Sequence, residues 1–148
     1  MKQASDKKIE FKHKTVMLAE TVDALNVAKG KLYLDATLGG GGHSSRVLEQ
    51  GGYIVAFDKD TTAINHVREK FSTRQDFIGK FTLIHDSFFN AKEALKNAFG
   101  QDIKLSGAIL DLGFSSNQVD DKNRGFSYMQ DGILDMRMDK TQKLTAKK

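Results

Sequence analysis

The stretch Asp35-Ala-Thr-Leu-Gly-Gly-Gly-Gly-His43 decides the fold class, because it joins a short apolar run to the start of a helical pattern. The apolar run covers residues 31–36, and the helical pattern covers residues 44–50. Glycines allow the chain to turn sharply after a strand and allow a ligand to lie against bare backbone. A strand, a glycine-rich turn and a helix in this order are typical of the ligand-binding end of a doubly wound α/β sheet. A turn that binds no ligand is the alternative interpretation.

The same alternation continues on both sides of this stretch. Apolar runs predict further strands over residues 53–58, 81–85 and 108–112, and helical patterns cover residues 16–27, 61–71 and 91–99. Asn90 and Glu93 predict a capping box at the start of the last of these helices, and Gly100 predicts its end. Repeated strand and helix favour a parallel sheet with right-handed crossovers.

The pattern of strands and helices stops after Leu112. Four strands are few for a doubly wound sheet, so we expect the chain to be the N-terminal part of a longer domain, truncated after the fourth strand. Leu110 and Leu112 would then lie beside an unpaired sheet edge, together with Ile109, and we expect self-association through that edge.

The charge of the chain lies mainly in its two ends. The 148 residues have a net charge of +4, but residues 1–14 contribute +3 and residues 140–148 contribute +4. We therefore predict a basic N-terminal arm over residues 1–14, a mildly acidic folded domain over residues 15–139 and a basic polar tail over residues 140–148. Net charge by itself does not indicate a nucleic-acid partner.

Composition excludes several classes of protein. The chain has no cysteine, which excludes disulfides, thiolate metal sites and thiol nucleophiles. Its four histidines show no ligand spacing, so no metal site is predicted. No apolar run approaches the length that spans a bilayer, and residues 1–14 lack the apolar core of a signal peptide, so a cytoplasmic location is expected.

Asp58 is the second candidate for ligand binding, because it ends the second predicted strand 19 positions after Gly39. An acidic residue at this place accepts hydrogen bonds from ribose hydroxyls in dinucleotide-binding folds. Asp58 or Asp60 could instead cap the helix that begins near Thr61, and both roles are compatible. Ser44 replaces the third glycine of the dinucleotide pattern, and no phosphate-binding lysine follows the loop. These features favour a nucleoside ligand without phosphates, such as S-adenosylmethionine, whose positive charge suits Asp35, Asp58 and Asp111.

Six strings of the chain resemble those of the RsmH (MraW) methyltransferases in order and spacing. They are Phe11-Lys-His-Lys-Thr-Val-Met-Leu-Ala-Glu20, Asp35-Ala-Thr-Leu-Gly-Gly-Gly-Gly-His-Ser44, Ala56-Phe-Asp-Lys-Asp60, Asp111-Leu-Gly-Phe-Ser-Ser-Asn-Gln118, Arg124-Gly-Phe-Ser127 and Leu134-Asp-Met-Arg-Met-Asp139. The resemblance implies a Rossmann-like class I methyltransferase sheet, S-adenosyl-L-methionine as cofactor, and small-subunit ribosomal RNA or the small ribosomal subunit as partner. The implied reaction is methylation of N4 of a cytosine.

The resemblance also implies roles for particular residues. Gly41, Gly42 and His43 would contact the methionine end of the cofactor, and Asp58 would hold its ribose. Phe88 would lie against the adenine, although a phenylalanine beside Phe89 at a strand end could equally pack in the core. Asp111 and Gln118 would complete the pocket.

The resemblance leaves the catalytic residue open. Asp111 or its backbone could face the target amine, or Asp111 could serve the cofactor pocket alone. Members of the family are longer, and their usual prolines are replaced here by Asn117, Ile133 and Lys140. A cofactor-binding but catalytically incompetent fragment is therefore the alternative function, and a nicotinamide-dependent dehydrogenase fragment is disfavoured by Ser44.

Overall fold

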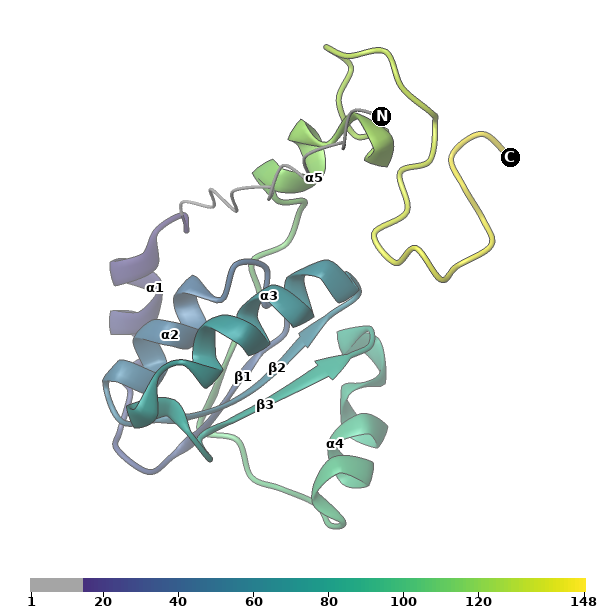
Figure 1. Cartoon of the computed structure of the whole chain (residues 1–148). Helices are drawn as coiled ribbons and strands as arrows, with labels where there is room; N and C mark the ends of the chain where they lie inside the picture. The colour runs from purple at the N-terminus through teal and green to yellow at the C-terminus, as the bar shows by residue number, and fades with distance from the viewer. Residues whose placement is uncertain (1–14) are drawn as a thin grey trace, which may run out of the picture.

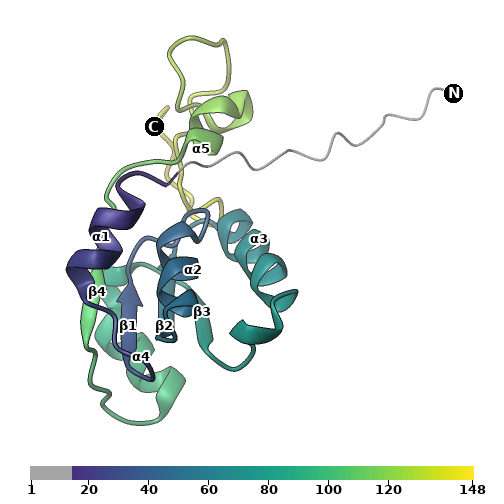
Figure 2. The ribbon, with the colours of Figure 1, turned by 90° about the vertical axis from the view of Figure 1, so that its left-hand side faces the viewer.

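A parallel β-sheet with the strand order β3-β2-β1-β4 forms the centre of the computed structural model (Figures 1 and 2). Its strands are β1 (Leu32–Asp35), β2 (Tyr53–Asp58), β3 (Phe81–His85) and β4 (Gly107–Ile109). The structure describes residues 15–148, so the predicted basic arm lies outside the described residues. Doubly wound Rossmann folds order their first four strands in this way, so the predicted fold class is confirmed.

Helices cover the two faces of the sheet unequally. Helices α1 (Leu18–Leu25), α2 (Gly42–Glu49) and α3 (Thr61–Ser72) lie on one face, and α4 (Ala91–Phe99) lies on the other (Figure 2). The chain therefore crosses to the opposite face after β3 and returns to add β4 beside β1. This change of direction creates a topological switch point between β1 and β4, where such sheets bind their ligands.

The core has two parts, one on each face of β2. Ile54 and Ala56 belong to the cluster under α1, α2 and α3, whereas Val55 and Phe57 pack with Leu95 of α4. These four consecutive side chains of β2 are all buried. Burial on both faces explains why β2 reads as a continuous apolar run rather than as an alternating one. Ile54, Val55 and Phe57 each contribute roughly 1.5 to 3 kcal/mol through burial, so β2 anchors the sheet.

Two local predictions need correction. Asn90 makes no side-chain cap, because it ends a 3₁₀ turn, η2 (Phe88–Asn90), that runs directly into α4. The fourth strand ends at Ile109 instead of Leu112. Ile109 is buried, but Leu110 and Leu112 lie beyond the strand and are 54% and 70% exposed.

The chain after β4 forms short elements rather than a continued sheet. They are α5 (Ser116–Asp120) and the 3₁₀ turn η3 (Lys122–Arg124), and α5 begins with a capping box in which Ser115 and Gln118 bond reciprocally. The following segment to Lys148 contains no helix or strand and passes near the carboxyl ends of the strands (Figure 2). Within residues 15–148, no helix combines the length and hydropathy needed to cross a membrane.

Candidate functional site

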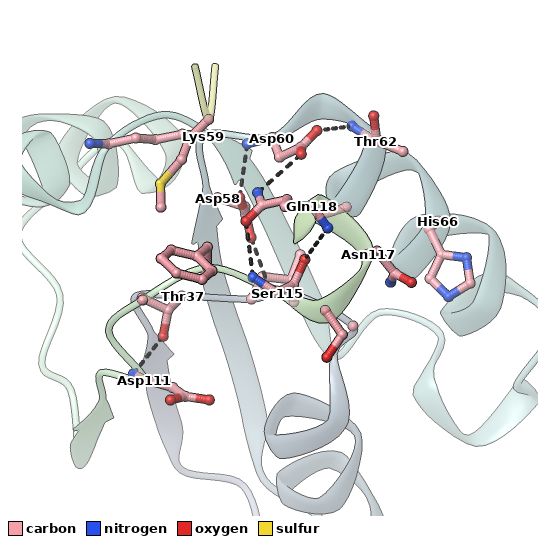
Figure 3. Close-up of a pocket in the computed structure, with 18 of the residues that line it drawn as sticks. Thr37, Asp58, Lys59, Asp60, Thr62, His66, Asp111, Ser115, Asn117 and Gln118 are labelled. Carbon is pink, nitrogen blue, oxygen red and sulfur yellow. Dashed lines mark hydrogen bonds between the residues drawn. The ribbon is translucent and has the colours of Figure 1, made fainter. Parts of the chain in front are cut away.

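A cavity of about 620 Å³ lies at the carboxyl ends of the four strands. This volume falls within the range of about 300 to 1,000 Å³ that is usual for small-molecule sites. The carboxyl end of each strand or the segment that follows it contributes lining residues: Thr37, Gly39 and Gly42 after β1, Asp58 at the end of β2 and Asp60 after it, Asp86 and Phe88 after β3, and Asp111, Asn117 and Gln118 after β4. The cavity thus occupies the switch point that the strand order creates. Figure 3 shows residues that line it.

The glycine loop presents only part of itself to the cavity. Gly39, Gly40 and Gly42 line it, but Gly41 does not. Gly41 has a φ of +69°, and a Cβ atom there would lie 2.9 Å from Val67 Cγ1 in the core. The resemblance implies that Gly41 contacts the cofactor, but the structure places Gly41 outside the cavity lining. The reason is that a side chain at this position would face Val67 of helix α3.

His43 lines the cavity, and one nitrogen of its buried ring lacks a hydrogen-bond partner among the described residues. Its side chain is only 5% exposed, and Nε2 has no hydrogen-bond partner among the described residues. A buried ring nitrogen without a partner costs free energy, which a polar ligand atom would recover. His43 therefore lines the cavity with an unsatisfied atom, and its contact with the cofactor stays a prediction.

Asp58 links the glycine loop to the loop after β2. Its Oδ2 accepts a hydrogen bond from the amide of Gly39 at 2.8 Å. Its Oδ1 accepts one from the amide of Asp60 at 2.8 Å, and Figure 3 labels both of these acids. Burial raises the pKa of Asp58, and the two amide hydrogen bonds oppose that rise. A carboxylate oxygen has room for a second donor, so both oxygens remain able to accept hydrogen bonds from a ligand.

Asp60 caps helix α3, and helix capping was one of the two roles considered for Asp58 and Asp60. Its Oδ1 accepts from the amide of Thr62 at 2.9 Å, which caps α3. Its Oδ2 accepts from Gln118 Nε2 at 3.2 Å and from Arg124 Nη1 at 2.7 Å. Gln118 therefore reaches the cavity as predicted, but its amide is already engaged with Asp60 and with the Ser115 backbone.

Phe88 and Asp111 both line the cavity. Phe88 follows β3 and Asp111 follows β4, which are the two outer strands of the described sheet. The Phe88 ring stacks on Phe89 with centroids 4.8 Å apart, and it also packs on the core cluster beneath α4. The two interpretations of Phe88 are thus compatible. Asp111 is exposed, and its amide donates to Thr37 Oγ1 at 2.7 Å, which ties the β4 loop to the β1 loop.

Asp35 does not belong to the acidic surroundings of the cavity, contrary to the expectation from sequence. It is 1% exposed, lies outside the cavity lining, and accepts hydrogen bonds from Ser44 Oγ at 2.7 Å and from the amide of Thr37 at 3.1 Å. Burial raises the pKa of Asp35, and these hydrogen bonds partly offset the rise. Asp35 holds the glycine loop in place from behind because its strand position points it into the core.

Several other residues line the cavity but were not predicted to do so from the sequence. They are Thr15, Lys59, Asp86, Asn117, Arg124, Met138 and Lys140. Asp86 could have been found, because it is a polar residue placed directly after a predicted strand. Arg124 and Met138 lie within strings that carry the family resemblance, but their place at the cavity depends on the return path of the chain. No group of residues within 15–148 has the arrangement of a metal site.

The fold and the cavity define a Rossmann-like α/β domain with a ligand-sized site at its switch point. The profile of the MraW methylase family matches residues 10–148. The chain belongs to this family. It is 43% identical to the ribosomal RNA small subunit methyltransferase H of Clostridium botulinum strain Okra and 48% identical to the protein of the same name from Lactiplantibacillus plantarum.

These relatives are considerably longer than the chain. The matches cover 93% and 92% of the chain but only 44% and 43% of the relatives, so the chain spans less than half of their length. Among solved structures, the C-terminal domain of precorrin-6Y C5,15-methyltransferase from Rhodobacter capsulatus is similar, with a TM-score of 0.55 and 20% identity over 76% of the chain and 55% of that domain. This likeness shows the fold alone.

Proposed function

We propose that the chain forms the cofactor-binding part of an S-adenosylmethionine-dependent methyltransferase that acts on N4 of a cytosine in small-subunit ribosomal RNA. The observation that supports this most directly is the cavity that joins the glycine loop, Asp58 and Asp111 at the switch point. The names of the two relatives support a ribosomal RNA substrate, and the string resemblance supports the cytosine.

The residues at the cavity fit such a cofactor. A Cβ atom built on Gly39 meets nothing nearer than 3.9 Å, so the loop leaves open space above its backbone. Asp58 can accept hydrogen bonds from two ribose hydroxyls, one at each carboxylate oxygen. His43 Nε2 needs a polar partner, and the half-buried Phe88 ring offers an apolar wall. A nucleoside that also has a polar, charged end satisfies all four groups.

When bound, the cofactor would supply an electrophilic methyl group to the substrate nitrogen. The chain would contribute position rather than acid–base chemistry, since an exocyclic amine can lose its proton after the new bond forms. Alignment of methyl group and nitrogen can contribute about 7 to 11 kcal/mol to the lowering of a barrier. The groups of Asp111 that can accept a hydrogen bond from a substrate amine are its carboxylate and its carbonyl, since its amide is a donor and is bonded to Thr37 Oγ1.

A cofactor-binding module without turnover is the second candidate function. It is favoured by the exposure of Asp111, Leu112 and Phe114 beside β4, which is an edge strand among the described residues. A target nucleotide would meet one wall of a cleft at this edge. We therefore expect the 148-residue chain to bind the cofactor without transferring its methyl group at a useful rate.

Calorimetry tests the binding site. The chain should bind S-adenosylmethionine or its demethylated product and should not bind NAD. Asp58→Ala should weaken binding by about 1 to 3 kcal/mol, because ribose hydroxyls would lose their acceptor. Asp23→Ala, on the exposed side of α1, is the matched control and should bind like the parent. Equal affinities of Asp58→Ala and the parent would refute the role of Asp58.

A transfer assay separates the two functions. Purified chain, small ribosomal subunits and radiolabelled cofactor should yield no label in the RNA above the background of the Asp58→Ala variant. Labelling that depends on Asp58 would show that this chain is an active enzyme by itself. Failure of the parent to bind the cofactor in calorimetry would exclude both candidate functions.

A further inference from the structure

Arg124 joins two parts of the chain that are distant in sequence. Its guanidinium is buried, with 5% of the residue exposed, and Nη1 donates to Asp60 Oδ2 at 2.7 Å. Its Nη2 donates to the carbonyls of Arg137 and Met138 at 3.1 and 3.0 Å. One side chain therefore connects the start of α3 to the backbone of the C-terminal segment, residues 134–148.

The backbone around Arg124 is built for close contact with this segment. The amide of Met136 donates to the carbonyl of Arg124 at 2.9 Å. Gly125 has a φ of +69°, and a Cβ atom there would overlap the Ile133 carbonyl. Gly132 likewise approaches the carbonyl of Lys122 so closely that a side chain would collide with it. These glycines allow backbone to lie on backbone where the segment begins.

The C-terminal segment reaches the candidate cofactor cavity. Met138 and Lys140 belong to its lining, and Arg124 lines it as well. At the other end of the network, Asp60 donates its amide to Asp58, the proposed ribose acceptor. A continuous set of hydrogen bonds thus runs from Gly39 through Asp58, Asp60 and Arg124 to the segment that forms one side of the cavity.

Charge strengthens the contact between Arg124 and Asp60. Burial acts to raise the pKa of Asp60, but the hydrogen bonds from Arg124, from the Thr62 amide and from Gln118 outweigh it, and the pKa lies below its usual value. The carboxylate is therefore ionised at neutral pH. Undocking of the segment would remove the two carbonyl partners of Arg124 and leave donors of a buried cation unpaired, which is costly.

We propose that Arg124 is a positioning residue that docks residues 134–148 against the cofactor cavity, so that docking of this segment and binding of the cofactor favour each other. The identity of the ligand rests on the proposed function. The coupling follows because Met138 and Lys140 contact the cavity only when the segment is docked. A ligand that gains contacts in the docked state stabilises that state by the same factor as docking improves its affinity.

Hydrogen exchange of the whole chain measures docking directly. The amides of Met136 and Ala146, which donate to the carbonyls of Arg124 and Asp135, report on the segment. In the absence of ligand, Arg124→Gln should speed their exchange about tenfold or more, as expected for loss of a charge-assisted hydrogen bond. Arg124→Lys should give an intermediate rate, because an ammonium can pair with Asp60 but lacks the fork that reaches both carbonyls.

Two controls show that the effect is specific. Arg74→Gln removes an exposed ion pair with Asp76 and should leave the segment unchanged. Amides of β2 should stay protected in every variant, since they lie in the core. If Arg124→Gln loses protection in β2 because it fails to fold, the comparison of Arg124→Lys with the parent decides the question.

Hydrogen exchange in the presence of ligand tests the coupling between docking of the segment and binding of the cofactor. Saturation with S-adenosylhomocysteine should slow exchange in residues 134–148 of the parent and should do so much less in Arg124→Gln. Equal exchange of the segment in the parent and in folded Arg124 variants would overturn the docking role. Ligand binding in calorimetry without slower exchange would overturn the coupling and leave the proposed function intact. Absence of binding would overturn the proposed function and the coupling, whereas the ligand-free comparison would still decide the role of Arg124.

Discussion

Asp58 accepts a hydrogen bond from the amide of Gly39 at 2.8 Å, although the two residues are 19 positions apart in the sequence. This bond fixes the open side of the glycine loop to the carboxyl end of β2. Gly41, two positions later, faces the opposite way into the contact with Val67 and Phe71. The loop therefore has one surface for a ligand and one for the core, and substitutions on the two surfaces should have different effects.

Gly41→Ala should destabilise the protein more than Gly39→Ala. Both positions have positive φ, so alanine strains the backbone at each, but only at Gly41 would the new methyl group press on core side chains. The overpacking should cost about 1 to 3 kcal/mol beyond the strain, as measured by urea unfolding. Gly39→Ala should instead reduce affinity for S-adenosylmethionine in calorimetry. The opposite ranking in either measurement would show that the loop surfaces are assigned wrongly.

The ion pair between Asp60 and Arg124 should contribute strongly to stability. Asp60→Asn keeps an acceptor for the Thr62 amide but leaves the buried guanidinium without its counter-charge. Loss of one partner of a buried pair costs about 3 to 5 kcal/mol, which urea unfolding would detect. Asp76→Asn, in the exposed pair with Arg74, is the matched control and should unfold like the parent. Similar midpoints for both variants would contradict the importance of burial.

Two buried carboxylates should give opposite pH dependences. Burial raises the pKa of Asp35, so its contribution to stability is fully present below 3.8 and is lost as the pH rises through the folded-state pKa. The free energy of unfolding of the parent minus that of Asp35→Asn should therefore fall as the pH rises towards neutrality. The pKa of Asp60 is lowered, so its contribution is present above 3.8 and is lost as the pH falls through the folded-state value. Unfolding at a series of pH values would refute this assignment if both differences changed in the same direction.

The edge of β4 should promote self-association. Ile109 is buried, but Leu110 is exposed next to a strand with no partner on its outer side among the described residues. Leu110→Lys places a charge at this edge and should reduce the concentration-dependent increase in sedimentation coefficient of the parent. Leu144→Lys changes a more exposed leucine in the C-terminal segment and serves as the control. A parent that remains monomeric at all concentrations would contradict the prediction.

The sequence by itself determined the class of the sheet, because that class depends on local patterns. Short apolar runs separated by helical periods define parallel strands with helical crossovers, and the strands over residues 53–58 and 81–85 have the predicted bounds. The places of Asp58 and His43 at the cavity also follow locally, since Asp58 ends a strand and His43 lies at the start of a helix. The capping box predicted at Asn90 does not form, although α4 begins at Ala91 as predicted, because Asn90 ends a 3₁₀ turn and its side-chain amide donates to Asp86.

Only the tertiary structure decided which groups these residues meet. Asp35 and Asp58 both end strands of the sheet, yet β1 turns Asp35 into the core whereas Asp58 lies at the cavity. Gly41 faces Val67 because α3 packs behind the loop, a contact that no local pattern encodes. The pairing of Asp60 with Arg124 spans 64 positions and depends on the path by which the chain returns over the sheet after β4. Such contacts arise from packing between distant segments, and the energy of burying an ion pair depends on that packing rather than on sequence spacing.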